Sequence, residues 1–208
     1  MSMYVKLNLP APSDPIIKQI KKFTNSVQYN ADSKRWLEEF HSNRVNVALH
    51  SLGNTDTEIN RQMVDEFQKF FPKHRILSTI CIMKSDGINL ASLPSHIDRG
   101  RALGINYFVE LGGEQVETIF YNLSKNTQAT SATNIVQEET GGVHTRAKFD
   151  QGWYAFRANQ CHSVENIQNS RIFTTLRILT GDSDTEVDYT LGALIKDYPE
   201  LIKGNRLS

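Results

Sequence analysis

The sequence has few cysteines, no excess of either charge and no long hydrophobic run. Its 208 residues include only Cys81 and Cys161, too few for a disulfide framework, which favours a reducing, cytoplasmic compartment. Lys plus Arg and Asp plus Glu number 23 each, which argues against a general nucleic-acid binder because such proteins need clustered positive charge. No segment approaches the roughly 20 apolar residues that span a bilayer. The start, MSMYVKLNLPAPSD, lacks the apolar core of a signal peptide, so we expect no membrane contact.

The remaining composition is that of a globular domain. Hydrophobic residues make up 39% and charged residues 22% of the chain, which is typical of folded proteins. The length predicts a single domain over residues 1–208. Within it we expect helical support in residues 1–74, a β core in residues 75–180 and a C-terminal helical extension in residues 181–208.

Helical signals gather in the first third of the chain. Ser13 and Pro15 precede the segment IIKQIKKF and predict a helix start. Residues 33–41, which include Trp36, have helical spacing. A third helix is predicted after a capping box formed by Thr55 and Glu58. Its apolar stripe, which should face the core, is Ile59, Met63, Phe67 and Phe70, and Pro72 ends it.

From residue 75 onward the pattern becomes that of strands. Five segments are short, β-branched or alternating: 75–83, 101–111, 117–122, 152–157 and 171–180. Many short strands with turns between them predict an all-β sandwich or barrel. The long segment from Ser124 to Gly142 is polar in its first part, and we expect it to form a lid over a site. Residues 189–204 predict a final helix interrupted near Pro199.

Three residues suggest a metal site. His96 and Asp98 are two positions apart, so in an extended segment their side chains lie on the same face. A lone His-x-Asp pair is a weak signal, and a surface pair explains it equally well. His162 follows much later, just after the strand predicted over 152–157. Two imidazoles and one carboxylate form the facial triad of non-haem Fe(II) oxygenases, which leaves coordination positions open.

Two arginines follow the second histidine. Arg171 opens the last predicted strand, and Arg177 lies six residues further on the same strand face. An arginine that points into a barrel is unfavourable unless it pairs with an anion. A dicarboxylic acid would suit the two-pronged guanidinium group. Arg177 is either a second anion contact or an ordinary outward residue.

Together these segments resemble a known family. The series SHIDRGRALGINYFV, ETIFYN and NQCHSVENIQNSRIFTTLRIL is similar to the Fe(II)/2-oxoglutarate-dependent dioxygenases, in particular to small phage and environmental members. The resemblance covers about residues 75–180. It implies a mainly β fold, the double-stranded β-helix or jelly roll, with flanking helices.

The resemblance also implies roles for individual residues. His96, Asp98 and His162 would bind Fe(II), and Arg171 would bind the distal carboxylate of 2-oxoglutarate. We expect no catalytic residue beyond the metal ligands. Asn106 and Tyr121 lie on strands after the His-x-Asp pair and are candidates for further cosubstrate contacts, as is Arg177. Many family members carry a serine two residues after the arginine, where this chain has Phe173.

The predicted function is therefore hydroxylation of a substrate with release of succinate and CO2. Its expected partners are 2-oxoglutarate, dioxygen and a primary substrate that is a small molecule or a protein side chain. The alternative is a cupin-like domain that binds a metal or a small anion without oxygenase activity. Arg99 and Arg101, next to the His-x-Asp pair, are either solvated or steer an anionic substrate.

Overall fold

The computed structural model describes residues 2–26, 47–52, 58–85, 91–98, 101–123, 140–180 and 189–202. Within these ranges the chain forms two sheets and several helices. The strands are β1 (Tyr4–Lys6), β2 (Val47–Leu52), β3 (Arg75–Ser85), β4 (Ala91–His96), β5 (Leu103–Leu111), β6 (Glu117–Leu123), β7 (Thr140–Ala147), β8 (Gly152–Arg157), β9 (His162–Ile167) and β10 (Arg171–Leu179). The helices are α1 (Asp14–Ser26), α3 (Glu58–Phe67), α4 (Leu191–Asp197) and the 3-10 turns η1 (Gln68–Phe70) and η2 (Pro199–Leu201).

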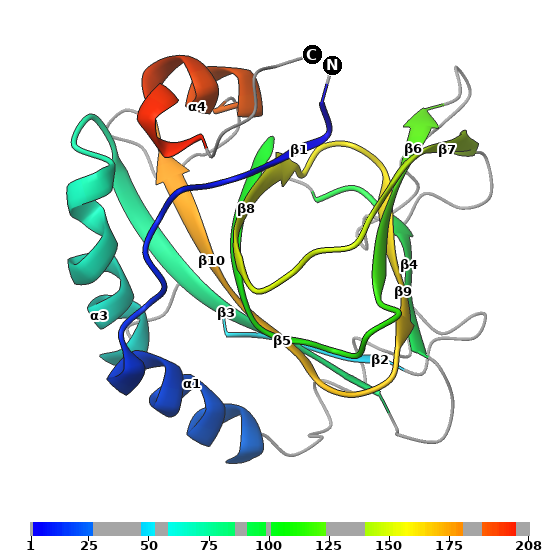
Figure 1. Cartoon of the computed structure of the whole chain (residues 1–208), viewed down its shortest axis with the longest axis horizontal. Coiled ribbons are helices and arrows are strands. Elements are labelled where there is room, and N and C mark those ends of the chain that lie inside the picture. The colour runs from blue at the N-terminus through cyan, green and yellow to red at the C-terminus, as the bar shows by residue number, and fades with distance from the viewer. Residues whose placement is uncertain are drawn as a thin grey trace.

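The two sheets face each other across the molecule (Figure 1). The larger sheet has the order β1-β8-β5-β10-β3-β2 and the smaller one has the order β4-β9-β6-β7. All pairings between these strands are antiparallel. This arrangement is a double-stranded β-helix, which confirms the predicted fold class.

Strand β10 shows how the larger sheet is buried on both faces. Ile172, Leu176 and Ile178 belong to a hydrophobic cluster shared with the helices. Phe173, on the opposite face, belongs to the cluster between the two sheets. Successive side chains of a strand point to opposite faces, so the odd-numbered residues of β10 face the interior of the β-helix. This places Arg171 on the interior side.

Helices α1 and α3 cover the outer face of the larger sheet (Figure 1). Ile20 of α1 and Phe67 of α3 are fully buried against it. The ring of Phe67 lies 4.9 Å from that of Trp153 in β8, and Trp153 Nε1 donates to the carbonyl of Pro10 at 2.7 Å. The helices therefore hold the sheet from behind, and its opposite face remains available for a site.

The N-terminal region departs from the prediction of helical support alone. Strand β1 pairs with β8 and strand β2 pairs with β3, so both extend the larger sheet. Strand β1 has three residues, too few for an alternating pattern to be recognised. Helix α1 begins as expected, since the carbonyl of Ser13 accepts from the N–H of Ile17 at 3.1 Å. The helix predicted over 33–41, the Thr55 cap, Arg99 and residues 124–139 of the expected lid lie outside the described residues.

The C-terminal segment forms α4 and then η2. Thr190 caps α4, because its Oγ1 accepts from the N–H of Ala193 at 3.2 Å. Pro199 begins η2, where the sequence predicts an interruption. Leu7 of the N-terminal segment forms a bridge with Ile202, so this C-terminal segment packs beside the start of the chain. None of the helices that the structure describes is long and apolar enough to cross a membrane.

Candidate metal centre

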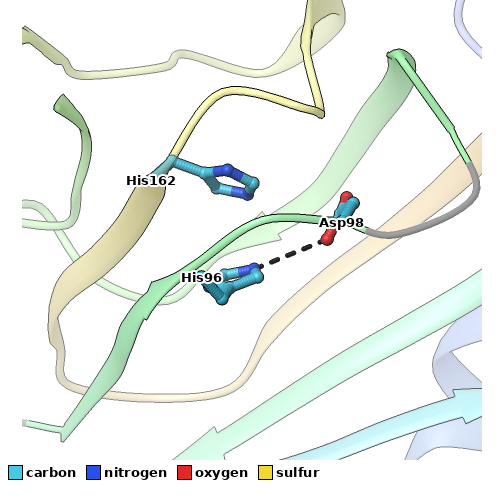
Figure 2. A group of neighbouring side chains, drawn as sticks. All are labelled: His96, Asp98 and His162. Carbon is cyan, nitrogen blue, oxygen red and sulfur yellow. Dashed lines mark ion pairs between the residues drawn. The ribbon is translucent and has the colours of Figure 1, made fainter. Parts of the chain in front are cut away.

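His96, Asp98 and His162 converge at one end of the smaller sheet. His96 ends β4 and His162 begins β9, and the register of these strands pairs the two residues directly. Asp98 follows two positions after His96, and its N–H donates to the carbonyl of Ala158 at 3.0 Å. One potential ligand atom from each of the three residues lies within 4.8 Å of the others. Figure 2 shows the three side chains turned toward a common point.

The Asp98 carboxylate is held in its charged form. Oδ1 lies 3.6 Å from Nε2 of His96, and Oδ2 accepts from Nε of Arg101 at 3.0 Å. Burial by itself raises the pKa of Asp98. The positive charge of Arg101 and the neighbouring imidazoles outweigh that effect, so the pKa lies well below its usual range. A deprotonated carboxylate is the form that binds a metal ion.

His162 is held in the neutral form that a metal ligand requires. Burial, followed by the proximity of His96, lowers its pKa to about 4. Its Nδ1 lies 2.8 Å from the carbonyl of Gln160, which can accept only if Nδ1 carries the proton. Nε2 is then the nitrogen with a free lone pair. The carbonyl thus fixes the tautomer and the orientation of the ring, as is common for metal-binding histidines.

These three residues border an interior cavity of about 210 Å³. Most of its walls are aromatic or aliphatic, and the side chains include Leu93, Phe108, Phe149, Phe156, Val164 and Phe173. The polar side chains among its lining residues include His96, Asp98, Arg101, Asn106, Thr118, His162 and Arg171. A concave apolar site with few polar groups is typical of small-molecule binding sites.

Arg171 is a buried cation on the wall of this cavity. Its Nη2 donates to Oγ1 of Thr118 at 3.2 Å, and its guanidinium carbon lies 4.7 Å from the centre of the Phe108 ring. Nε is buried without a hydrogen-bond partner, and no carboxylate among the described residues forms an ion pair with Arg171. Burial lowers its pKa to about 9, so it stays charged at neutral pH. Such a group favours an anion in the cavity.

The other predicted cosubstrate residues are placed differently. Asn106 lines the cavity, and its Oδ1 accepts from Oγ1 of Thr175 at 2.7 Å. Tyr121 is not among the cavity-lining residues. Its hydroxyl group instead forms a hydrogen bond of 2.9 Å with Oγ of Ser163. Arg177 does not line the cavity either. It lies six residues along β10 from Arg171, which is about 20 Å at the rise of an extended strand.

The structure places two further residues at the site. The sequence leaves Arg101 as either a solvated or a steering residue, and the structure shows it only 21% exposed and in an ion pair with Asp98. Its position three residues after Asp98 was the signal available in the sequence. Phe173, at the position where many members of the resembled family carry serine, lines the cavity and lies 5.9 Å from Phe108. The cavity wall is therefore more apolar there.

Comparisons with known proteins show similarity in structure and not in sequence. The sequence matches no protein-family profile and no curated protein. The fold is similar to that of a prolyl hydroxylase from Trichoplax adhaerens, solved in complex with a peptide fragment of the hypoxia inducible factor oxygen degradation domain. That match has a TM-score of 0.50 and 12% identity, and it covers 85% of this chain and 83% of the other.

Two further solved structures are more distant. A prolyl-4-hydroxylase from Pseudomonas putida has a TM-score of 0.42 and 11% identity, over 85% of this chain and 94% of that protein. The epimerase SnoN, in complex with Fe3+, alpha ketoglutarate and nogalamycin RO, has a TM-score of 0.44 and 12% identity, over 84% and 77% of the two chains. The likeness to the Trichoplax prolyl hydroxylase is a likeness of fold.

Proposed function

We propose that this protein is a non-haem Fe(II)/2-oxoglutarate-dependent oxygenase that hydroxylates an organic substrate. His96, Asp98 and His162 would hold the iron, and Arg171 would bind the distal carboxylate of 2-oxoglutarate. The donor set fits this metal, because two imidazoles and one carboxylate are the ligands of facial-triad Fe(II) sites. When bound, the iron would activate dioxygen, which is the oxidant: one oxygen atom would enter the substrate and the other would enter succinate as 2-oxoglutarate loses CO2.

The observation that carries this proposal is the presence of Arg171 in the same cavity as the three ligands. A domain that only binds a metal has no need of a buried guanidinium group beside its site. Arg171 is 4% exposed and its Nε is unpaired. An anion in the cavity would offset the free energy cost of burying that charge, which Thr118 and the Phe108 ring offset in part. A dicarboxylate can contact Arg171 at one end and extend toward the metal ligands with the other.

The polar residues of the cavity would bind the ligand, and the apolar residues would exclude water from it. Thr118 and the Phe108 ring hold the guanidinium group of Arg171 in one orientation. Thr175 donates to Oδ1 of Asn106, so the amide NH2 of Asn106 is left to donate to a ligand in the cavity. The phenylalanine side chains around them exclude water, which strengthens these polar contacts.

The test is anaerobic addition of Fe(II) and then 2-oxoglutarate to the purified chain. We expect a weak visible charge-transfer band and, once air is admitted with a substrate, formation of succinate. Absence of the band in a folded, iron-loaded sample would contradict the proposal and favour a cupin-like binding domain. Arg171→Met should weaken 2-oxoglutarate binding by about 100-fold or more, as expected for loss of a buried charge-assisted pair. Arg177→Met, on the same strand but outside the cavity, is the matched control.

A further inference from the structure

The side chain of Arg101 holds one oxygen of Asp98 through two donors. Nε lies 3.0 Å and Nη2 lies 2.5 Å from Oδ2 of Asp98. Oδ1 of the same carboxylate lies 3.6 Å from Nε2 of His96. Because two nitrogens of a rigid, planar group bind Oδ2, the carboxylate cannot rotate freely. Its two oxygens therefore have different surroundings: Oδ2 accepts from Arg101 and Oδ1 lies beside His96.

The backbone around this ion pair is held in place independently of any ligand. The N–H of Asp98 donates to the carbonyl of Ala158, and the N–H of Ala158 donates to the carbonyl of Ala102, each at 3.0 Å. The two ends of the segment that carries Asp98 and Arg101 are thus bound to the same residue beyond β8. Both side chains line the cavity and are about one-fifth exposed. The ion pair is therefore part of the cavity wall.

We propose that Arg101 is a positioning residue that limits Asp98 to a single-oxygen contact with the metal ion. This inference rests on the proposed function. Two imidazoles and one carboxylate oxygen would hold the metal and leave coordination positions open for 2-oxoglutarate and dioxygen. A second contact from Oδ2 of Asp98 would remove a position that the reaction needs, and the bond to Arg101 prevents it.

An orientation role and a simple charge effect predict opposite results when Arg101 is removed. A cation beside a metal site repels the metal ion. At a pH where Asp98 stays deprotonated with or without Arg101, removal of Arg101 would tighten metal binding if this residue acted only by repelling the metal ion. If it orients Asp98, its removal weakens binding, because the carboxylate is no longer held for the metal. Loss of such an outer partner typically weakens metal affinity by about 10- to 100-fold.

The experiment is titration of the full chain with Co2+, followed by its visible absorption, under conditions where no turnover occurs. We expect Arg101→Met to weaken Co2+ binding by about 10-fold or more and to change the absorption spectrum at saturation, because both oxygens of Asp98 can then reach the metal. Arg101→Lys keeps the charge and one donor, so it should recover part of the loss. Arg146→Met is the matched control, since Arg146 pairs with Glu117 at 3.0 Å outside the cavity.

Two results would overturn the role of Arg101. One is Co2+ binding by Arg101→Met that is as tight as, or tighter than, binding by the unmodified chain. The other, which applies even if that variant fails to fold, is an Arg101→Lys variant with unchanged affinity and an unchanged Co2+ spectrum. Failure of the unmodified chain to bind Co2+ at all would instead overturn the proposed metal site. The two failures are thus distinguishable.

Discussion

His96 and His162 are direct partners in neighbouring antiparallel strands, and their ring centres lie 4.3 Å apart. A metal ion bound between them would connect β4 to β9 as well as provide a reaction centre. The strand register, more than any local feature of either segment, brings the ligands together. Predictions about the site can therefore be tested through binding and through stability.

Removal of either imidazole should abolish stoichiometric metal binding. We expect His96→Ala and His162→Ala to lose Co2+ binding in a calorimetric titration, because each removes one of three protein ligands. His144→Ala should bind Co2+ like the unmodified chain, since His144 lies exposed on β7. Metal binding that survived both cavity variants would place the metal elsewhere.

The stability of the metal-free protein should fall as the pH falls from about 6.5 to about 4. Burial and the neighbouring His96 lower the folded-state pKa of His162 from 6.5 to about 4. Between these values the unfolded chain binds the additional proton, so stability rises with pH in this window. The pKa difference corresponds to roughly 3 kcal/mol. Urea unfolding at several pH values should show the slope, and His162→Gln should show a smaller one. A slope unchanged in that variant would assign the pH dependence to other groups.

Gly112→Ala should weaken 2-oxoglutarate binding as well as stability. Gly112 has a φ of +89°, and a Cβ added there would lie 2.9 Å from Cβ of Arg171. The backbone strain costs about 1 kcal/mol, and the contact would displace Arg171. Gly142→Ala is the control, because its φ is +87° but nothing lies within 4 Å of the added Cβ. Thermal unfolding should show a loss in both variants, and a 2-oxoglutarate titration should show a loss in Gly112→Ala only. Equal 2-oxoglutarate affinity in the two variants would contradict this placement of Arg171.

Thr175→Val should destabilise the fold by about 1–3 kcal/mol, because Oδ1 of buried Asn106 loses its hydrogen-bond donor. The amide of Asn106 would also lose its fixed orientation, so we expect weaker 2-oxoglutarate binding. Thr175→Ser keeps the hydroxyl and should retain most of the affinity. Urea unfolding and ligand titration measure the two effects. A valine variant as stable as the unmodified chain would show that Asn106 finds another donor.

Strands could be predicted from the sequence where they are long enough to show a strand-like pattern of residues. Strands β5 and β10 have nine residues each, and both lie in segments that the sequence predicts as strands. Strand β4 has the sequence ASLPSH, which contains Pro94 and no alternation. Proline is tolerated in an edge strand, and β4 lies at the edge of its sheet. Its presence follows from pairing with β9, which the sequence alone does not reveal.

In the candidate site, too, patterns within one segment could be interpreted from the sequence, whereas contacts between distant segments could not. The spacing of His96 and Asp98 and the position of Arg171 could be interpreted from the chain alone. The face on which Tyr121 lies could not, because Phe120 and not Tyr121 packs against His162, at 5.9 Å. Phe120 is paired directly with His162 in β9, and neighbouring residues of a strand point to opposite faces. Which of the two faces the interior therefore depends on the partner strand.

The position of β4 has a consequence for how metal enters and leaves. Edge strands open locally at lower free energy than central strands, and β4, which carries His96, is bonded within its sheet to β9 alone. Separation of β4 from β9 would part the two imidazoles while the larger sheet and its helices stay folded. Metal exchange could then proceed by fraying at the sheet edge, without global unfolding. Backbone amide hydrogen exchange in β4 would then report metal occupancy, slowing as the ion binds.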